Sequence, residues 1–407
     1  MIGDPKPSAA AVPATGERRG RFVRACARLL LAAALLWPAA GSADHDRIPD
    51  PAPRSTAARL PAGLRLDGGA VTVSGLSSGG FFAHQFHVAH SALVAGAGIL
   101  AGGPYGCVET IANPHWPHPP LDWFSAALVA CTRYSGDRFW GLRPDPPRVE
   151  DSLALVAEAR RRGDIDDPAQ LADDRVWLFL GERDAIVPEA VAAALRGLYE
   201  GLGVGGARLR VEAGDPRRPA NHGMPVERFR GDSRFPRRDC SEHRPPFIVE
   251  CGYDAAERLL RHLYPEGFNG AAADPHAAGT LAAFDQAEFF GRGGATAGLS
   301  GVGYVYVPAA CAGGGCRLHV AFHGCRQNVD ARGADRAHDD FVRDAGYNRW
   351  AAANRIVVLY PQATESALNP NRCWDFWGYT GLDYRTRSGP QMRAVKGMVD
   401  RLLGAPD

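Results

Sequence analysis

The chain has 407 residues, of which 45% are hydrophobic and 22% are charged, the composition of an ordinary globular protein. This apolar content is ample for one large α/β domain or two smaller ones. Removing residues 1–43 takes away six of the 46 basic and two of the 45 acidic residues, leaving a net charge of −3. Such a charge excludes the strongly basic character of a nucleic-acid-binding protein.

The first 43 residues have the pattern of a secretory signal peptide. Five arginines between residues 18 and 28 precede the apolar stretch 29–36, and small residues follow as far as Ala43. The apolar stretch is too short to span a bilayer, so we expect cleavage near Ala43, no membrane anchor afterwards, and a secreted or periplasmic protein. A short uncleaved anchor is the alternative. Residues 44–65 are rich in Pro, Ala and Asp, which predicts a flexible leader.

The residues around Ser77 predict a sharp turn between a strand and a helix. The apolar run 70–73 precedes Gly75-Leu76-Ser77-Ser78-Gly79, and a helical pattern begins at Gly80. In this context a G-x-S-x-G motif is a nucleophile elbow, in which the serine is strained and the glycines avoid collisions. A second partial match, at 298–302, fails at its fifth position.

Strands and helices alternate along the rest of the chain. In order, we expect a strand at 92–101, a helix at 149–161, a strand at 176–180, a helix at 188–200, a strand at 207–212 and a helix at 255–263. The rhythm then resumes with strands at 304–308 and 317–322, a helix at 338–354, a strand at 356–360 and a last helix at 390–403. Continuous apolar runs such as 176–180 are typical of strands buried on both faces.

This alternation, together with the elbow, predicts an α/β-hydrolase fold with a mostly parallel sheet flanked by helices. In that fold a helix such as 390–403 normally leads into the strand that carries the elbow. Here that strand opens the domain and the helix closes the chain, so the economical explanation is a circular permutation. No repeat or domain linker interrupts residues 66–407, which we expect to form a single catalytic domain.

Cysteine usage indicates disulfide bonds. Cys26 lies in the predicted signal peptide, and eight cysteines remain, an even set in a chain bound for an oxidising compartment. The short separations suggest the pairs Cys107–Cys131, Cys240–Cys251 and Cys311–Cys316, which leaves Cys325 for Cys373. This pairing is a hypothesis, because connectivity does not follow from sequence.

A serine hydroxyl needs an imidazole to take its proton and a carboxylate to orient that imidazole. The order in α/β-hydrolases is serine, acid, histidine. Asp184 follows the buried strand 176–180 and is our candidate acid; the alternative is that it caps the next helix. His222 follows the strand 207–212 through a polar loop and is our candidate base, although a lone loop histidine is more often only solvated.

The oxyanion formed during ester cleavage must be met by fixed N–H donors. The elbow itself supplies the amide of Ser78, and a loop after an early strand should supply the second donor. The strand 317–322 is followed by His323-Gly324-Cys325, so we assign the amide of Cys325. A Cys325–Cys373 disulfide would hold this oxyanion hole rigid; the alternative is a disulfide with no part in the active site.

Three segments resemble poly(3-hydroxybutyrate) depolymerases of the permuted, single-domain type. They are the elbow at 75–80, the segment 318–327 and the segment 371–377. The similarity covers roughly residues 66–404. The resemblance implies a triad of Ser77, Asp184 and His222 and an oxyanion hole made by Ser78 and Cys325. It also implies that a tryptophan of the segment from Trp374 to Trp377 lines the substrate groove.

Other aromatic and histidine patterns carry less weight. Trp116, Trp123, Trp374, Trp377 and Tyr379 lie in stretches rich in Pro or Gly, which would allow an exposed apolar patch for a polyester but also suits ordinary loop anchors. Three histidines from residue 84 to residue 90 recur every third residue, a spacing that drifts around a helix. No H-E-x-x-H site is present, so we expect neither a metal nor an organic cofactor.

The sequence therefore predicts a secreted serine esterase that cleaves poly(3-hydroxybutyrate) or its oligomers through an acyl-enzyme, releasing hydroxyacid monomers or short oligomers. The expected partner is this polyester or oligoester substrate. An alternative is an esterase acting on feruloyl or acetyl groups of plant polysaccharide with the same triad. A hypothesis of another class is a catalytically silent polymer-binding protein.

Overall fold

A computed structural model describes residues 57–110, 127, 131–132, 145–228, 238–290, 297–329 and 339–405. The predicted signal peptide, Trp116 and Trp123 lie outside these ranges. Residues 1–51 and 52–407 separate into two units, and the described residues all belong to the second. In the part of the chain that the structure describes, no helix is long and apolar enough to cross a membrane.

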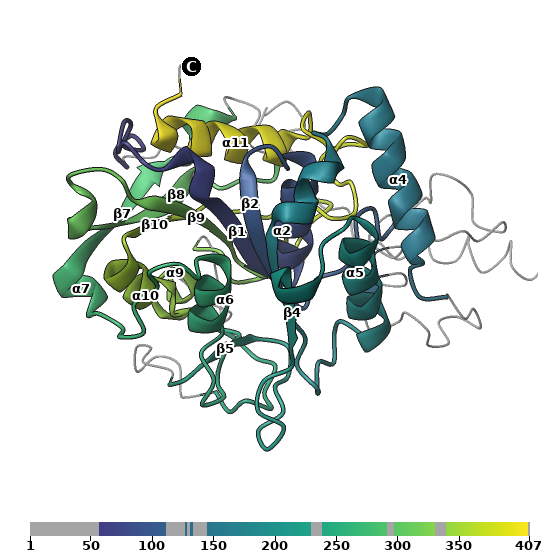
Figure 1. The fold of residues 1–407 in the computed structure, drawn as a ribbon, viewed down its shortest axis with the longest axis horizontal. Helices are drawn as coiled ribbons and strands as arrows, with labels where there is room; N and C mark the ends of the chain where they lie inside the picture. The colour runs from purple at the N-terminus through teal and green to yellow at the C-terminus, as the bar shows by residue number, and fades with distance from the viewer. Residues whose placement is uncertain are drawn as a thin grey trace, which may run out of the picture. The chain divides into compact units, whose positions relative to one another are not determined.

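An eight-stranded sheet forms the centre of this second unit (Figure 1). Its order is β4-β3-β2-β1-β9-β10-β8-β7. All neighbours from β4 to β10 pair in parallel, while β8 pairs antiparallel with β10 and β7 antiparallel with β8. The strands are β1 (Val71–Leu76), β2 (Val94–Leu100), β3 (Arg175–Phe179), β4 (Leu209–Glu212), β7 (Gly279–Asp285), β8 (Val302–Pro308), β9 (Arg317–Phe322) and β10 (Ile356–Tyr360). The predicted mostly parallel sheet is confirmed.

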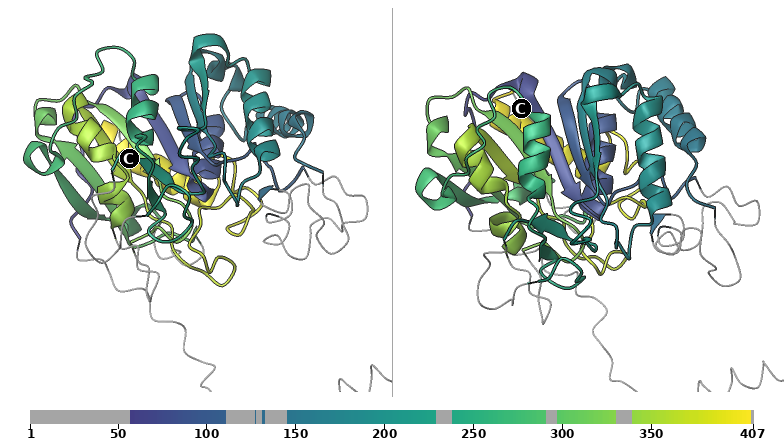
Figure 2. Two further views of the ribbon diagram at one scale, coloured as in Figure 1. Left: turned by 90° about the horizontal axis from the view of Figure 1, so that it is seen from below. Right: turned by 60° about the horizontal axis from the view of Figure 1, so that its bottom comes forward.

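Helices cover both faces of the sheet, with α6 and α10 on one side and α4 and α5 on the other (Figure 2). Alternate strand residues point to opposite faces. Trp177 and Phe179 of β3 join the core packed against α6, α9 and α10, while Val176 and Leu178 join the core packed against α2, α4, α5 and α11. The helices are α2 (Ser78–Ala89), α4 (Val149–Arg162), α5 (Glu189–Gly201), α6 (Ala255–Leu263), α7 (Pro275–Ala278), α9 (Asp340–Asp344), α10 (Tyr347–Asn354) and α11 (Pro390–Leu403).

The ends of the described chain support the circular permutation. Strand β1 lies in the middle of the sheet, between β2 and β9, although it is the first strand of the domain. Helix α11 ends at Leu403, and a Cβ added to the next residue, Gly404, would lie 3.7 Å from the Cα of Gly63, in the segment that leads into β1. The last helix therefore ends where an unpermuted chain would enter the elbow strand, and the predicted α/β-hydrolase fold with permuted order is confirmed.

Two expectations about the elements are wrong, and one strand was not predicted. The fold begins before residue 66, because Ala58 pairs with Phe284 and Leu60 is buried. The helix predicted at 338–354 is two helices, α9 and α10, separated at Gly346, whose φ of 94° a continuous helix does not allow. Strand β7 has no long apolar run, because it lies at the edge of the sheet and is half exposed, so its sequence gave no strand signal.

His84, His319 and His323 are among the fully buried histidines of the domain. Burial lowers the pKa of His84 and His319 to about 3 and that of His323 to about 4. His319 is held neutral between hydroxyls, with Thr72 Oγ1 and Ser74 Oγ each 2.7 Å from its ring nitrogens. Neither ring nitrogen of His84 has a hydrogen-bond partner among the described residues. Each ring is thus uncharged in the folded protein at neutral pH.

We predict that these histidines make the protein acid-labile. Their folded-state pKa is depressed, so the unfolded chain binds more protons below about pH 6.5, and stability present above that pH is lost as the pH falls. Each should contribute about 1.4 kcal/mol of lost stability per pH unit from roughly pH 6 down to its own folded-state pKa of about 3 or 4. The free energy of unfolding is measured in urea between pH 5 and pH 6. In His84→Leu its slope against pH should fall by the equivalent of about one proton. The control is His276→Leu, because His276 is exposed and its replacement should leave the slope unchanged. An unchanged slope in His84→Leu would contradict the prediction.

Candidate active site

The elbow at Ser77 has the strained geometry that its sequence predicts. Ser77 has φ 56° and ψ −124°, and it stands between the end of β1 and the start of α2. Its N–H donates to the carbonyl of Leu100 at 2.9 Å, which ties the turn to the end of β2. A Cβ on Gly75 would collide with the carbonyl of Gly79, and one on Gly79 would collide with the carbonyls at the end of β9. Both glycines are therefore required by close backbone approach.

Asp184 and His222 meet as an acid–base pair. The Nδ1 atom of His222 lies 2.8 Å from Oδ2 and 3.0 Å from Oδ1 of Asp184, and the two side chains are 7% and 2% exposed. Burial by itself would raise the pKa of Asp184, but the adjacent imidazole and the N–H groups of Val187 and Ile186 hold it below its ordinary value. The carboxylate is thus ionised and fixes the orientation of the ring.

The alternative role of Asp184 as a helix cap is not what the structure shows. The N-cap of α5 is Pro188, and no side chain caps it. The carboxylate instead accepts the N–H groups of Ile186 and Val187, each at 2.8 Å, within its own loop. These bonds set the direction in which the carboxylate faces His222.

Asn221 joins the acid loop to the histidine loop, a role the sequence analysis missed. Its Oδ1 accepts the N–H of His222 at 2.7 Å and that of Ala185 at 3.3 Å, while its Nδ2 donates to the carbonyl of Ser241 at 2.9 Å. The amide therefore joins the backbone of His222 to that of Ala185, the residue after Asp184. Asn221 directly precedes the candidate base, and this adjacency was the available signal.

Topology places Ser77 at the same edge of the sheet as Asp184. Strands β1, β2 and β3 are parallel neighbours, and Ser77 and Asp184 follow the carboxyl ends of β1 and β3. Ala101, after β2, donates to the carbonyl of Phe179 at the end of β3, 2.8 Å away. No hydrogen bond between Ser77 Oγ and His222 is found among the described residues, so their engagement stays a prediction.

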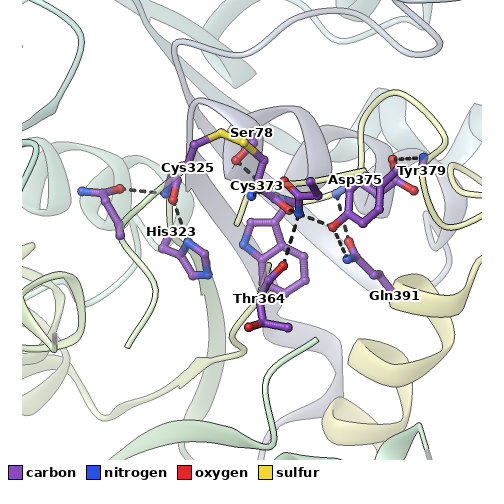
Figure 3. Close-up of a disulfide and its surroundings, with 12 residues drawn as sticks. Ser78, His323, Cys325, Thr364, Cys373, Asp375, Tyr379 and Gln391 are labelled. Carbon is purple, nitrogen blue, oxygen red and sulfur yellow. Dashed lines mark hydrogen bonds between the residues drawn. A yellow bond between two sulfur atoms is a disulfide. The ribbon is translucent and has the colours of Figure 1, made fainter. Parts of the chain in front are cut away.

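The loop after β9 lies against the elbow, as expected for a second oxyanion donor. A Cβ on Gly324 would lie 3.3 Å from the carbonyl of Leu76, directly before Ser77. The adjacent Cys325 is bonded to Cys373, with an S–S distance of 2.01 Å (Figure 3). The N–H of Trp374 donates to Ser78 Oγ at 3.2 Å, so the disulfide-linked segment also contacts the elbow helix.

The four predicted disulfide pairs are confirmed. Each pair lies at bonding distance, including Cys107–Cys131, which joins two described positions on either side of a range that the structure leaves out. The pairs are Cys107–Cys131, Cys240–Cys251, Cys311–Cys316 and Cys325–Cys373.

Asp375 organises the segment that carries Cys373, and the sequence analysis did not identify it. Its fully buried carboxylate accepts the N–H groups of residues 377–380 and the hydroxyl of Thr380, at 2.7–3.2 Å. The N–H of Asp375 donates to Gln391 Oε1 on α11 at 3.0 Å (Figure 3). The carbonyl of Asp375 accepts from Gln85 Nε2 on α2, also at 3.0 Å. The segment around Asp375 is thereby fixed to helices α2 and α11.

The expected exposed aromatic patch is wrong for Trp374 and Trp377. These side chains are 0% and 2% exposed, so neither presents a surface to solvent. Trp374 packs against Phe82 and Phe322, with ring centroids 4.7 and 5.0 Å apart. The indole of Trp377 packs against its neighbour Phe376. The two indoles are buried because this disulfide-linked loop packs as part of the core.

The histidines of the elbow helix also face inward. His87 Nε2 lies 3.0 Å from Asp174 Oδ2, and its Nδ1 lies 3.1 Å from the hydroxyl of Tyr199. Across the described ranges, no three His, Cys, Asp or Glu side chains gather in a way that would hold a metal ion. These rings therefore belong to the interior packing of α2.

Two curated relatives align with most of the chain, while no family model matches it. A poly(3-hydroxybutyrate) depolymerase of Delftia acidovorans is 37% identical over 85% of this chain, and the chain spans only 62% of its length. A polyhydroxybutyrate depolymerase of Talaromyces funiculosus is 30% identical over 85% of this chain and 93% of the relative.

Solved structures give the same result. The crystal structure of a PHB depolymerase from Penicillium funiculosum matches with a TM-score of 0.68 and 28% identity over 86% of this chain and all of that one. A serine-to-alanine variant of a PHB depolymerase complexed with an R3HB trimer matches with a TM-score of 0.69, at the same identity and coverage. With this fold, this elbow and these relatives, the chain belongs to the poly(3-hydroxybutyrate) depolymerase family of carboxylic ester hydrolases.

Proposed function

We propose that the protein is a secreted serine esterase that hydrolyses poly(3-hydroxybutyrate) or its oligomers, with Ser77 as nucleophile. The observation that carries the proposal is the buried Asp184–His222 pair at the edge of the sheet where the strained Ser77 elbow stands. An acid and a base that were far apart in the sequence are in contact, in a chain whose relatives carry the name of this activity.

In the proposed reaction, Ser77 Oγ attacks the ester carbonyl while His222 Nε2 takes its proton. The Nδ1–H group of His222 donates to Asp184, which fixes the tautomer and stabilises the imidazolium. The N–H groups of Ser78 and Cys325 donate hydrogen bonds to the carbonyl oxygen and stabilise its negative charge. Collapse of this intermediate breaks the ester C–O bond, and the alcohol end of the chain leaves with the proton from His222. Water then attacks the acyl-enzyme by the same steps and releases the acid.

Location outside the cytoplasm is part of the proposal. Eight described cysteines form four disulfide bonds, which persist in oxidising compartments and are rare in the cytosol. The basic, apolar and small-residue regions of the first 43 residues fit a secretory signal. Together they favour a secreted or periplasmic enzyme.

The bound substrate of a solved relative supports an oligoester ligand. That relative is a serine-to-alanine variant complexed with an R3HB trimer. We therefore propose that this chain acts on the polymer or on oligomers of this chemistry, releasing hydroxyacid monomers or short oligomers. Product analysis on the polyester and on feruloylated or acetylated polysaccharide separates this function from a carbohydrate esterase.

Ser77→Ala should abolish hydrolysis. Loss of the nucleophile removes the covalent route, and the rate should fall by at least about 10⁴-fold. The measurements are clearing of a poly(3-hydroxybutyrate) emulsion and release of acid from a soluble oligomer. Ser300→Ala is a matched control, because Ser300 stands in a Gly-Leu-Ser context at 298–300 without an elbow. Retained clearing by Ser77→Ala would refute the assignment, and inactive wild-type protein would favour a silent binding protein.

Asp184→Asn should lower kcat by about 10⁴-fold while the fold persists. An amide in place of the carboxylate can donate to Nδ1, which favours the wrong tautomer of His222 and leaves an imidazolium uncompensated. The control is Asp254→Asn, because Asp254 is also a buried loop carboxylate, bonded to Glu257 N at 3.0 Å and Trp350 Nε1 at 2.9 Å. Steady-state kinetics on a soluble ester, with circular dichroism for folding, checks both variants. Equal activity of Asp184→Asn and wild type would exclude Asp184 as the acid.

A further inference from the structure

Gln327 closes the loop that carries the proposed second oxyanion donor. Its side chain is 1% exposed. Oε1 accepts the N–H of Gly324 at 2.7 Å, and the N–H of Gln327 donates to the carbonyl of Gly324 at 3.2 Å. Both contacts join Gln327 to Gly324, and Cys325 lies between these two residues in the sequence. The amide therefore fixes the turn in which the N–H of Cys325 lies.

The other end of the same amide reaches the segment beside His222. Nε2 donates to the carbonyl of Pro246 at 3.0 Å and approaches that of Phe247 at 3.4 Å. The Phe247 carbonyl also accepts the N–H of Met224 at 2.8 Å, and a Cβ on Gly223 would lie 3.1 Å from it. Residues 223 and 224 directly follow the candidate base. One buried side chain thus contacts backbone on the oxyanion side and on the histidine side.

The segment it holds is itself rigidly attached to the histidine loop. The Cys240–Cys251 disulfide closes it, and Asn221 N donates to the carbonyl of Cys240 at 2.9 Å. The ring of His243, within this segment, stands edge-on to the ring of His222 at 5.3 Å. A displacement of residues 240–251 would therefore move the imidazole.

We propose that Gln327 is a positioning residue, which fixes the position of the Cys325 N–H relative to the imidazole of His222. The inference rests on the proposed function. The Cys325–Cys373 disulfide attaches the oxyanion loop to the elbow side, while Gln327 attaches it to the base side. The oxyanion donor and the proton carrier must act on one ester carbonyl at once, and small misplacement of such groups is costly.

An amide suits this position because it carries an acceptor and a donor in one plane. Gln327→Met keeps the length and loses both functions. In Gln327→Glu, the protonated carboxyl retains a carbonyl acceptor and an O–H donor, whereas the carboxylate has no donor and faces two carbonyl oxygens. Burial among such groups favours the protonated form, so this variant should regain the native contacts as the pH falls.

The test is kcat and KM on a soluble short-chain ester from pH 5 to pH 8, each variant expressed relative to wild type. Gln327→Met should lower kcat roughly tenfold to hundredfold at every pH, with KM within about threefold. Gln327→Glu should be similarly slow at pH 8 and recover at least about threefold relative to wild type towards pH 5. This recovery distinguishes positioning from a merely structural loss, which would not depend on the protonation of residue 327.

Gln286→Met is the matched control. Gln286 is a fully buried glutamine whose amide makes three hydrogen bonds of 2.8 Å, to Ser300 and Gln362. Its loss should lower thermal stability and leave kcat of the folded enzyme within about twofold. The proposal is overturned if Gln327→Met retains kcat within twofold of wild type, or if Gln327→Glu is equally slow at every pH. Inactive wild-type protein instead overturns the proposed function itself.

Discussion

The close approach of the elbow to the end of β9 is the constraint on which the site depends. Gly79 has no side chain because the carbonyls of Phe322 and His323 occupy the space that a Cβ would need. At the same turn Ser77 has a strained φ of 56°, and Gly324 of the loop at 323–325 lies against the carbonyl of Leu76, next to the proposed nucleophile. A backbone held this tightly places the proposed oxyanion donors before any substrate arrives, which is the condition for electrostatic stabilisation of a developing charge.

The circular permutation leaves this constraint intact because it changes connectivity and not neighbours. The elbow strand β1 and the strand β9 are adjacent in the sheet, yet they come from the beginning and the later part of the domain. Bringing them together closes a long loop, whose entropic cost rises only slowly with length. Buried hydrogen bonds strengthen the seam, since His319 of β9 contacts both Thr72 and Ser74 of β1. The central pairing thus combines a parallel backbone ladder with side-chain hydrogen bonds between the two strands, without a local connection.

Sequence reasoning succeeded where a residue type is dictated by local backbone or by apolar pattern. The elbow glycines, the buried strand β3 and the amphipathic α6 are of this kind, and so is the order of acid and base that brought Asp184 and His222 together. It failed where a role depends on distant partners. Asn221, Gln327 and Asp375 are ordinary loop residues in the sequence, and their functions appear only when segments far apart meet. The burial of Trp377 has the same origin, because a loop becomes part of the core only through tertiary packing.

Disulfides and side-chain amides have different effects on the site. A disulfide limits the separation of two segments but leaves rotation about its own bonds, whereas a planar amide bonded at both ends also sets direction. The Cys325–Cys373 bond keeps the loop at 323–325 near the elbow. Gln327 orients the same loop by hydrogen bonds to Gly324 and to Pro246, which lies in the segment beside His222. Asn221 does the same between the acid and base loops. The geometry of the proposed site is therefore set by side-chain amides acting across loops, while the covalent links keep those loops close enough for the amides to bond.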